Sequence, residues 1–351
     1  MFEIDGGQKS GSGTILRLAV ALSAITQQPL HITNIRKRRP RPGLKMQHLE
    51  SVLTAAKLCN ATVEGAKLAS EELWFTPRQI EGGHVEAVIE TAGSIPMLFM
   101  AVLPICVYAK NSVTLHVAKG GTDTLYAPTV NYLQYVLLPT LRKMGINAEV
   151  TVQKYGYYPK GMGEASMTVQ PISVLKPIQL ESFGKLESIN GVSVCTFLAE
   201  KQVAKRQAKA AIQTLTKTIN NDGYLQPKIC VLDDMSNPYQ KGSSIVLWAK
   251  TDTGALVGAD ALGGLGKTSE SVGENVAEKL VVELKSEPTV DVFLADMLIL
   301  YMALARGKSF FYTRYISEHI EANIWLIETM LNSMFSIEKV NNLLYRIEKT
   351  C

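Results

Sequence analysis

Hydrophobic positions in this chain follow a strand period and a helix period in turn, and the same order of elements returns after about 80 residues. The first unit is predicted to hold a strand, a helix, a strand, a helix and two closing strands, at residues 2–5, 14–26, 30–35, 44–59, 61–68 and 72–76. A second unit repeats this order at residues 84–90, 93–109, 112–118, 127–144, 148–154 and 165–169. This regularity predicts a repeat architecture of βαβαββ units.

Most of a third unit ends the chain, with helices, strands and closing strands predicted at residues 292–305, 309–316, 319–332, 334–338 and 343–347. The stretch before it is too long for a loop. It carries strands of its own at 191–197, 228–232, 244–249 and 255–259, and helices at 201–218 and 271–285. We therefore predict a mixed α/β (α+β) fold, in which a large domain of three βαβαββ repeats (1–177 and 286–351) receives a smaller inserted α/β domain (178–285).

Residues 91–109 contain no charge and are long enough to be considered as a membrane span. Pro96, Pro104 and the Gly93-Ser94 start favour a buried helix instead, so we predict no membrane association. Hydrophobic content of 46% with 19% charged residues is typical of a soluble globular protein. No basic leader precedes an apolar run at the N-terminus, and the cysteines have no zinc or redox spacing, which predicts a reducing, cytoplasmic location: Cys59, Cys106, Cys195, Cys230 and Cys351.

The most basic segment is residues 36–45, where six of ten side chains are cationic and none is acidic. Pro40, Pro42 and Gly43 interrupt it, so the cations extend from a stiff, non-helical segment. A helix is predicted to follow, and its free N–H groups and positive dipole end add to the same field. We interpret this segment as a site for a polyphosphate or an RNA backbone, with a solvated basic loop as the alternative. Lys201, Lys205 and Lys209 share one helical face in the insert, which is predicted to be solvated, an RNA-facing patch being the alternative.

Two other junctions between a strand and a helix carry residues suited to phosphate chemistry. The glycine-rich turn at residues 6–13 can present backbone N–H groups to phosphate, but it matches neither the Walker nor the dinucleotide pattern, and a tight structural turn is the alternative. His319 stands where the last helix is predicted to begin. A helix N-terminus disfavours imidazolium and keeps a histidine neutral, as a nucleophile must be. A capping or core role is the alternative for His319.

Seven blocks, in order from one end of the chain to the other, resemble the RNA 3′-terminal phosphate cyclase family. They are IDGGQKSGSGTILRL, IRKRRPRPGLKMQHL, ETAGSIPMLFMAVLP, KGGTDTLYAP, GYYPKGMGE, FLADMLILYMALA and SEHIEANIWLIE. Seven ordered blocks are far more specific than a single glycine motif. The resemblance implies three βαβαββ units and a smaller inserted α/β domain, in agreement with the hydrophobic pattern.

The resemblance implies ATP-dependent conversion of an RNA 3′-terminal phosphate into a 2′,3′-cyclic phosphate. His319 matches the family's nucleophile, which takes AMP from ATP before the AMP passes to the RNA 3′-phosphate. The implied partners are RNA with a 3′-phosphate end, ATP as a substrate, and a divalent metal such as Mg, whose ligands the resemblance leaves unassigned. The implied phosphate contacts are Arg17, Arg36, Arg39 and Gln47. The implied nucleotide contacts are Met100, Pro128, Phe293, Leu294, Ala295, Asp296 and Met297.

Several positions depart from the family's pattern. Ser10 stands where the family has an acid that serves the metal and nucleotide, and amides around the nucleotide are replaced by Met100 and Met297. Thr14, Phe293 and Ala322 replace a Gln, a Tyr and a Thr. These departures keep open a non-catalytic RNA-binding paralogue that acts in ribosome or RNA assembly, although the presence of His319 favours the enzyme. An enolpyruvyl-transferase-like enzyme also repeats a βαβαββ unit, but the insert and the basic segment argue against it.

Overall fold

The first βαβαββ unit follows the hydrophobic pattern closely. In the computed structural model, which describes residues 1–219 and 226–350, the unit consists of β1 (Phe2–Asp5), α1 (Gly13–Thr26), β2 (Leu30–Thr33), α2 (Met46–Cys59), β3 (Thr62–Glu64) and β4 (Leu73–Thr76). The sheet has the order β1-β2-β4-β3, with β1 parallel to β2 and the other pairs antiparallel. The strand predicted at 61–68 is shorter than expected, because Gly65 adopts φ 78° and a turn begins there.

The second unit repeats this topology. It consists of β5 (Gly83–Val88), α3 (Ile95–Val107), β6 (Val113–Gly120), a composite helix, β7 (Asn147–Lys154) and β8 (Gly163–Gln170), in the sheet order β5-β6-β8-β7. The composite helix replaces the single helix predicted at 127–144. It begins at α4 (Val130–Tyr132), capped by the Thr129 hydroxyl, passes through a π-helical turn, η1 (Leu133–Leu137), and ends in α5 (Leu138–Lys143).

The third unit contains α8 (Val292–Leu304), β13 (Ser309–Thr313), α9 (Glu318–Leu331), β14 (Phe335–Lys339) and β15 (Tyr345–Lys349), in the order β13-β15-β14. Its sheet has three strands, and on the outer side of β13 it pairs with an isolated bridge residue far upstream. Gln179 forms a parallel bridge with Phe310, and the backbone N–H of Leu180 donates to the Phe310 carbonyl at 3.1 Å. We therefore propose that the inserted segment begins after Leu180 rather than at residue 178, and that this bridged segment takes the place of the first strand of the third unit.

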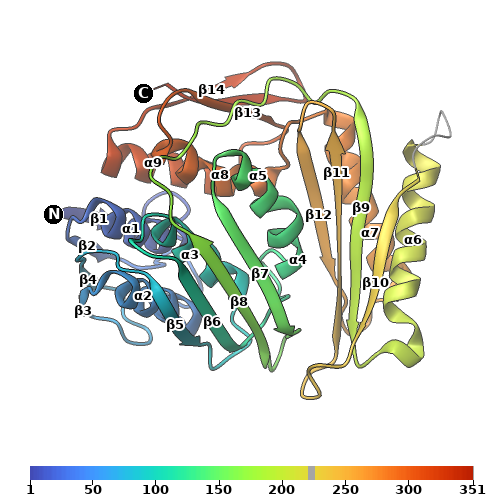
Figure 1. The fold of residues 1–351 in the computed structure, drawn as a ribbon, viewed down its shortest axis with the longest axis horizontal. Helices are drawn as coiled ribbons and strands as arrows, with labels where there is room; N and C mark the ends of the chain where they lie inside the picture. The colour runs from blue at the N-terminus through green and yellow to red at the C-terminus, as the bar shows by residue number, and fades with distance from the viewer. Residues whose placement is uncertain (220–225, 351) are drawn as a thin grey trace.

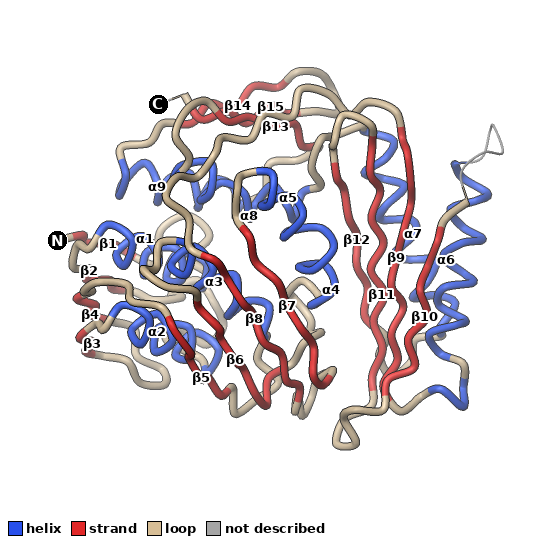
Figure 2. Tube along the Cα trace, viewed as in Figure 1, coloured by secondary structure: helices blue, strands red, loops and turns tan. Residues whose placement is uncertain are grey.

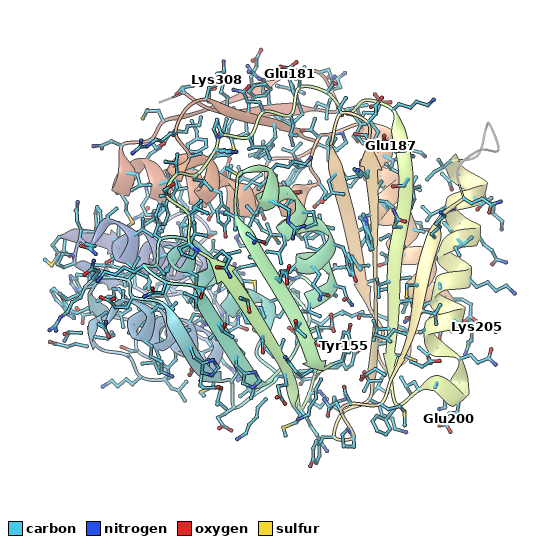
Figure 3. All side chains as sticks on the ribbon, in the orientation of Figure 1. Tyr155, Glu181, Glu187, Glu200, Lys205 and Lys308 are labelled. Atoms are coloured by element: carbon cyan, nitrogen blue, oxygen red, sulfur yellow. The ribbon has the colours of Figure 1, made fainter. Side chains whose placement is uncertain are left out.

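The inserted segment forms a sheet of order β10-β9-β11-β12 and two long helices that cover one of its faces (Figure 1). Its elements are β9 (Leu186–Thr196), α6 (Val203–Ile219), β10 (Lys228–Asp234), β11 (Gly242–Thr251), β12 (Leu256–Leu262) and α7 (Ser269–Ser286). Between this sheet and its helices lies a separate apolar cluster that includes Leu215, Ile245 and Leu280. The three lysines predicted to be solvated are exposed, and Lys205 points away from the sheet (Figure 3).

The helices of the three units lie inside the molecule, with sheets on the outside (Figure 2). The sequence explains this arrangement, because α3 has no charged residue and α1 and α8 have one each, Arg17 and Asp296. The charge-free stretch 91–109 is therefore a buried helix, as predicted. No helix in the described ranges has the length and apolarity to cross a membrane. The four described cysteines are free thiols, and Cys351 lies outside the described residues.

The inserted sheet meets the large domain through a close backbone approach at Gly258 on β12. The Gly258 N–H donates to Asp291 Oδ2 at 2.8 Å, and the Tyr132 hydroxyl donates to Asp291 Oδ1 at 2.7 Å. Asp291 also caps α8 by accepting from the N–H groups of Phe293 and Leu294, both at 3.0 Å. One buried carboxylate thus joins β12, α4 and α8.

Replacing Gly258 with Ala should destabilise this junction. The added Cβ would lie 2.6 Å from Val136 and 3.0 Å from Tyr132, and overpacking of this kind costs about 1–3 kcal/mol. Urea unfolding should therefore show a lower midpoint for Gly258→Ala. Gly264→Ala is the matched control, since its Cβ would meet no atom closer than 4.0 Å. Equal midpoints for the two variants would contradict the close approach.

Candidate active site

A cavity of about 760 Å³ opens between the central helices and the inserted segment. The central helices each contribute one stripe of side chains with the spacing i, i+3, i+4, i+7. The stripes are Thr14, Arg17, Leu18 and Ala21 on α1; Met97, Met100, Ala101 and Pro104 on α3; and Phe293, Asp296, Met297 and Leu300 on α8. His319 and Asn323 on α9 complete this side of the wall. Of the residues proposed from sequence, Arg17, Met100, Pro128, Phe293, Asp296, Met297 and His319 line the cavity together.

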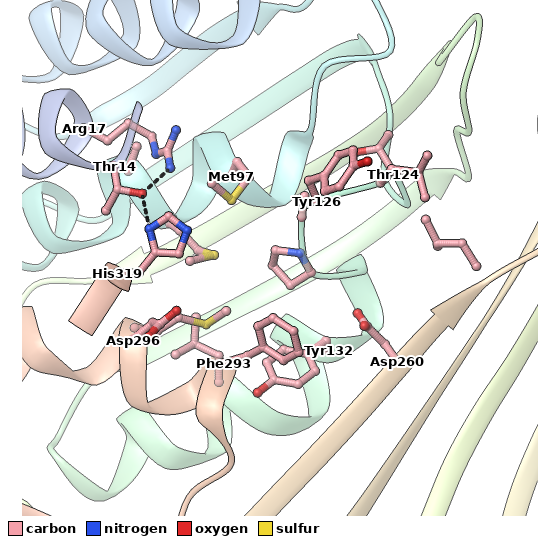
Figure 4. A pocket seen from close by; sticks show the side chains of 18 of the residues that line it. Thr14, Arg17, Met97, Thr124, Tyr126, Tyr132, Asp260, Phe293, Asp296 and His319 are labelled. Carbon is pink, nitrogen blue, oxygen red and sulfur yellow. Dashed lines mark hydrogen bonds between the residues drawn. The ribbon is translucent and has the colours of Figure 1, made fainter. Parts of the chain in front are cut away.

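His319 is held at the start of α9 and faces the start of α1 (Figure 4). Its Nδ1 lies 3.5 Å from Thr14 Oγ1, which accepts a hydrogen bond from Arg17 Nη2 at 3.3 Å. Ser317 caps α9 by accepting from the Ile320 N–H. Burial lowers the pKa of His319, and the positive charges of Arg17 and Arg39 lower it further. The imidazole is therefore favoured in its neutral form, as the sequence analysis expects for a nucleophile.

Arg17 and Arg39, whose charges act on His319, belong to a cluster of cations without carboxylate partners among the described residues. Burial lowers the pKa of Arg17 to about 10, and the charge of Arg36 contributes. The pKa of Lys45 is lowered by burial and then by Arg36 and Arg41. Among the ion pairs of residues 1–219 and 226–350, none joins these cations or Arg39 to a carboxylate. Positive charges that repel one another in a partly desolvated site favour binding of an anion.

His48, on the first turn of α2, is a buried member of this cluster that the sequence analysis did not assign to the site. Its Nδ1 is buried and has no hydrogen-bond partner in the part of the chain that the structure describes. Burial lowers the pKa of His48 to about 2, with further contributions from Arg17, Arg36 and Lys45. A Cβ at Gly13 would overlap the His48 ring, so this close approach of α1 and α2 requires glycine.

Asp296 is the only acidic residue on α8, and it lies beside His319 in Figure 4. The Ser317 hydroxyl donates to Asp296 Oδ1 at 2.5 Å, and Asn323 Nδ2 donates to the Asp296 carbonyl at 2.9 Å. Burial raises the pKa of Asp296 to about 7, although the Ser317 hydrogen bond acts against this rise. The other polar side-chain atom of Asn323, Oδ1, is buried without a partner among the described residues, and Asn323 lines the cavity.

The remaining proposed residues lie outside the cavity wall. Leu294 and Ala295 are fully buried in the main core, because they occupy the side of α8 opposite the stripe. Gln47 Oε1 accepts from the Ser94 N–H at 3.0 Å and so secures the start of α3. Arg36 is buried with φ 58°, and its Nη1 donates to the carbonyls of Arg41 and Gly43 at 2.8 and 2.6 Å. Arg39 is exposed.

The described residues do not fit a protein-built magnesium site. No group of three or more His, Cys, Asp or Glu residues that could hold a metal ion occurs in the described ranges. At the position where the resemblance implies an acid, the Ser10 hydroxyl is hydrogen-bonded to Ser12 Oγ at 3.0 Å. We therefore assign no metal ligands and derive no step through a metal.

The pH dependence of the free energy of unfolding should reveal that His48 is buried with a lowered pKa. Because the folded pKa is about 2 and the unfolded value is 6.5, the unfolded state binds a proton first, and stability is lost as the pH falls below about 6.5. His48→Gln should reduce the slope of unfolding free energy between pH 6 and 4 by up to about 1.4 kcal/mol per pH unit. Urea unfolding at several pH values measures this slope. His84→Gln, which changes an exposed histidine, should retain the slope of the unaltered protein. Parallel pH profiles for all three proteins would contradict the assignment.

Comparison with known proteins places the chain in a family. Residues 8–337 match the family model described as RNA 3′-terminal phosphate cyclase. Relatives with that name are 42% identical in Methanosarcina barkeri, over 98% of both chains, and 40% identical in Pyrococcus furiosus, over 96% of this chain and 95% of the relative. A third, from Pyrobaculum aerophilum, is 38% identical over 98% of this chain and 97% of its own length. The chain belongs to the RNA 3′-terminal phosphate cyclase family.

Proposed function

We propose that this enzyme converts an RNA 3′-terminal phosphate into a 2′,3′-cyclic phosphate through an AMP adduct of His319. The observation that carries the proposal is the neutral imidazole of His319, held at a helix start among cations that have no carboxylate partners. Family membership supports the overall reaction and the use of ATP. It also favours the enzyme over the non-catalytic alternative.

The first step needs one ring nitrogen of His319 with a free lone pair. Nδ1 faces Thr14 Oγ1. In our proposal Nδ1 carries the ring proton and donates a hydrogen bond to this oxygen. Nε2 then attacks the α-phosphorus of ATP, a P–N bond forms, and pyrophosphate leaves with the electrons of the broken P–O bond. The guanidinium of Arg17, whose Nη2 is anchored on Thr14, stabilises the negative charge that develops on the phosphoryl oxygens.

Two further steps complete the proposed reaction. An oxygen of the RNA 3′-phosphate attacks the phosphorus of the His319 adduct, which breaks the P–N bond and activates the RNA phosphate. The adjacent 2′-hydroxyl then attacks the RNA phosphorus and releases its proton to solvent, while AMP leaves with the electrons of the broken phosphoanhydride P–O bond. Activation is needed because a phosphate monoester has no good leaving group, whereas AMP is one. The last attack is intramolecular, so it avoids the entropic cost of bringing two molecules together.

The apolar part of the cavity suits the nucleoside. In the proposal the base lies between Pro128 and Phe293, a residue that is 57% exposed at the cavity. Met100 and Met297 supply apolar contact rather than hydrogen bonds. Asp296, which lines the cavity together with His319, is proposed to contact the ribose. Arg39, with the rest of the basic segment, is proposed to bind the RNA phosphates.

His319→Ala should abolish both labelling of the protein by ATP radioactive at the α-phosphate and cyclisation of a 3′-phosphorylated RNA, by ~10³-fold or more. The fold should survive, because His319 is only partly buried. Denaturing gels measure the label, and circular dichroism checks the fold. His84→Ala, outside the cavity, should behave like the unaltered protein. Undiminished labelling of the His319→Ala protein would show that another residue is the nucleophile.

Arg39→Ala should weaken binding of a 3′-phosphorylated RNA and make that binding less dependent on salt. Loss of one phosphate contact reduces the slope of log K against log salt by about 0.7 for single-stranded RNA. Fluorescence anisotropy without ATP, at several salt concentrations, measures this slope. Arg78→Ala removes the same charge from an exposed position outside the basic segment and is the control. Identical slopes for both variants would assign Arg39 to a solvated loop.

A further inference from the structure

The end of the cavity opposite His319 is built by the inserted segment. Asp260 on β12 and Lys267, Ser271, Asn275 and Lys279 on or next to α7 line it. Figure 4 shows Asp260 and His319 on opposite sides of Phe293. A nucleotide with its α-phosphate at His319 and its base beside Phe293 therefore directs the far edge of the base toward Asp260.

From this geometry we infer that Asp260 reads the base of the nucleotide, by accepting a hydrogen bond from the 6-amino group of adenine. The inference rests on the proposed function, since the position of the α-phosphate at His319 sets which way the base points. It adds a specificity-determining residue from a part of the chain that the sequence motifs do not cover. Because Met100 and Met297 leave the middle of the cavity apolar, the polar side chains of this far end are the ones suited to distinguish one base from another.

The hydrogen bonds of Asp260 fix which of its atoms can face the ligand. Oδ2 accepts from the Thr129 N–H at 2.8 Å, directly after the Pro128 wall of the cavity. Lys279 Nζ donates to the Asp260 backbone carbonyl at 2.8 Å and so leaves the carboxylate to other donors. A carboxylate accepts at about four lone-pair positions, so the contacts with Thr129 do not exhaust it.

The neighbouring groups favour adenine over a base with an oxygen at position 6. A carboxylate accepts from an amino group but repels a carbonyl oxygen. The amide of Asn275 and the ammonium of Lys279 place donors at the same end of the cavity, which suits the unprotonated N1 of adenine. Guanine could instead turn its N1–H and 2-amino groups toward Asp260. In that case the protein would bind GMP more tightly than AMP.

Asp260→Asn replaces the carboxylate oxygen that does not bind the Thr129 N–H with an NH₂ group of similar size. An acceptor at this position thus becomes a donor. The Thr129 N–H requires an acceptor, so it keeps the amide oxygen on its own side and turns the NH₂ group toward the cavity. The variant then presents a donor to the 6-amino group of AMP and to the 6-carbonyl oxygen of IMP. If the role of Asp260 were only structural, the variant would bind AMP and IMP more weakly by the same factor. Recognition of the base instead changes the ratio of the two affinities.

Titration calorimetry with AMP, IMP and GMP tests the inference, because these monophosphates bind without any transfer step. We expect the unaltered protein to bind AMP at least tenfold more tightly than IMP or GMP, and Asp260→Asn to lower the AMP-to-IMP ratio at least tenfold. Glu274→Gln, which removes an exposed acid from α7 outside the cavity, should retain the original ratio. Purine riboside 5′-monophosphate, which lacks the 6-amino group, should bind the unaltered protein at least tenfold more weakly than AMP, independently of any variant.

An AMP-to-IMP ratio that Asp260→Asn leaves within twofold of the original would overturn the inference, as would a preference for GMP or no binding of any of these nucleotides. Failure of the proposed function is a different result. A protein that forms no His319 adduct and cyclises no RNA can still show the expected ratio, and an active cyclase with an unchanged ratio overturns the role of Asp260 alone.

Discussion

The removal of α1, α3 and α8 from water is the constraint on which the rest of the structure depends. These helices are almost entirely apolar, and the sheets of the three units close around them. An ionisable group on such a helix is retained at a cost in free energy unless it faces a ligand. Arg17 and Asp296 are the charged residues of α1 and α8, both line the cavity, and burial shifts both pKa values toward the neutral form. The charged side chains of these apolar central helices are thus located at the wall of the cavity.

The repeat architecture brings equivalent junctions together and gives them different tasks. The start of α1 supplies Thr14, the start of α2 supplies His48, and the start of α9 supplies His319. Gly13 allows α1 and α2 to approach closely, since any side chain there would overlap the His48 ring. Helix starts and cations add their positive potential in one region, which suits a triphosphate and an RNA end in the same site.

The sequence predicted those features that depend on local pattern. Helices with a clear apolar stripe were located to within a few residues, and the motif at His319 led to a cavity-lining residue. The π-helical turn at Leu133–Leu137 could not be predicted, because its apolar residues fit an ordinary helix. The bridge at Gln179 involves too few residues to give a strand pattern in the sequence, and only its pairing with Phe310 identifies it. Leu294 and Ala295 came with Phe293 and Asp296 in one motif, but helix geometry turns them into the core.

Asp291 shows why the contribution of the inserted segment escapes a motif search. This buried carboxylate accepts hydrogen bonds from β12, from Tyr132 and from the first turn of α8, so it sets the distance between the inserted sheet and Phe293. Burial raises the pKa of Asp291 to about 6, and four donors stabilise its ionised form against that rise. Asp260 lies two residues beyond Gly258 on the same strand, and therefore its place in the cavity depends on this junction. Residues far apart in the sequence are held together at this junction, because the buried carboxylate of Asp291 needs hydrogen bonds from all of them at the same time.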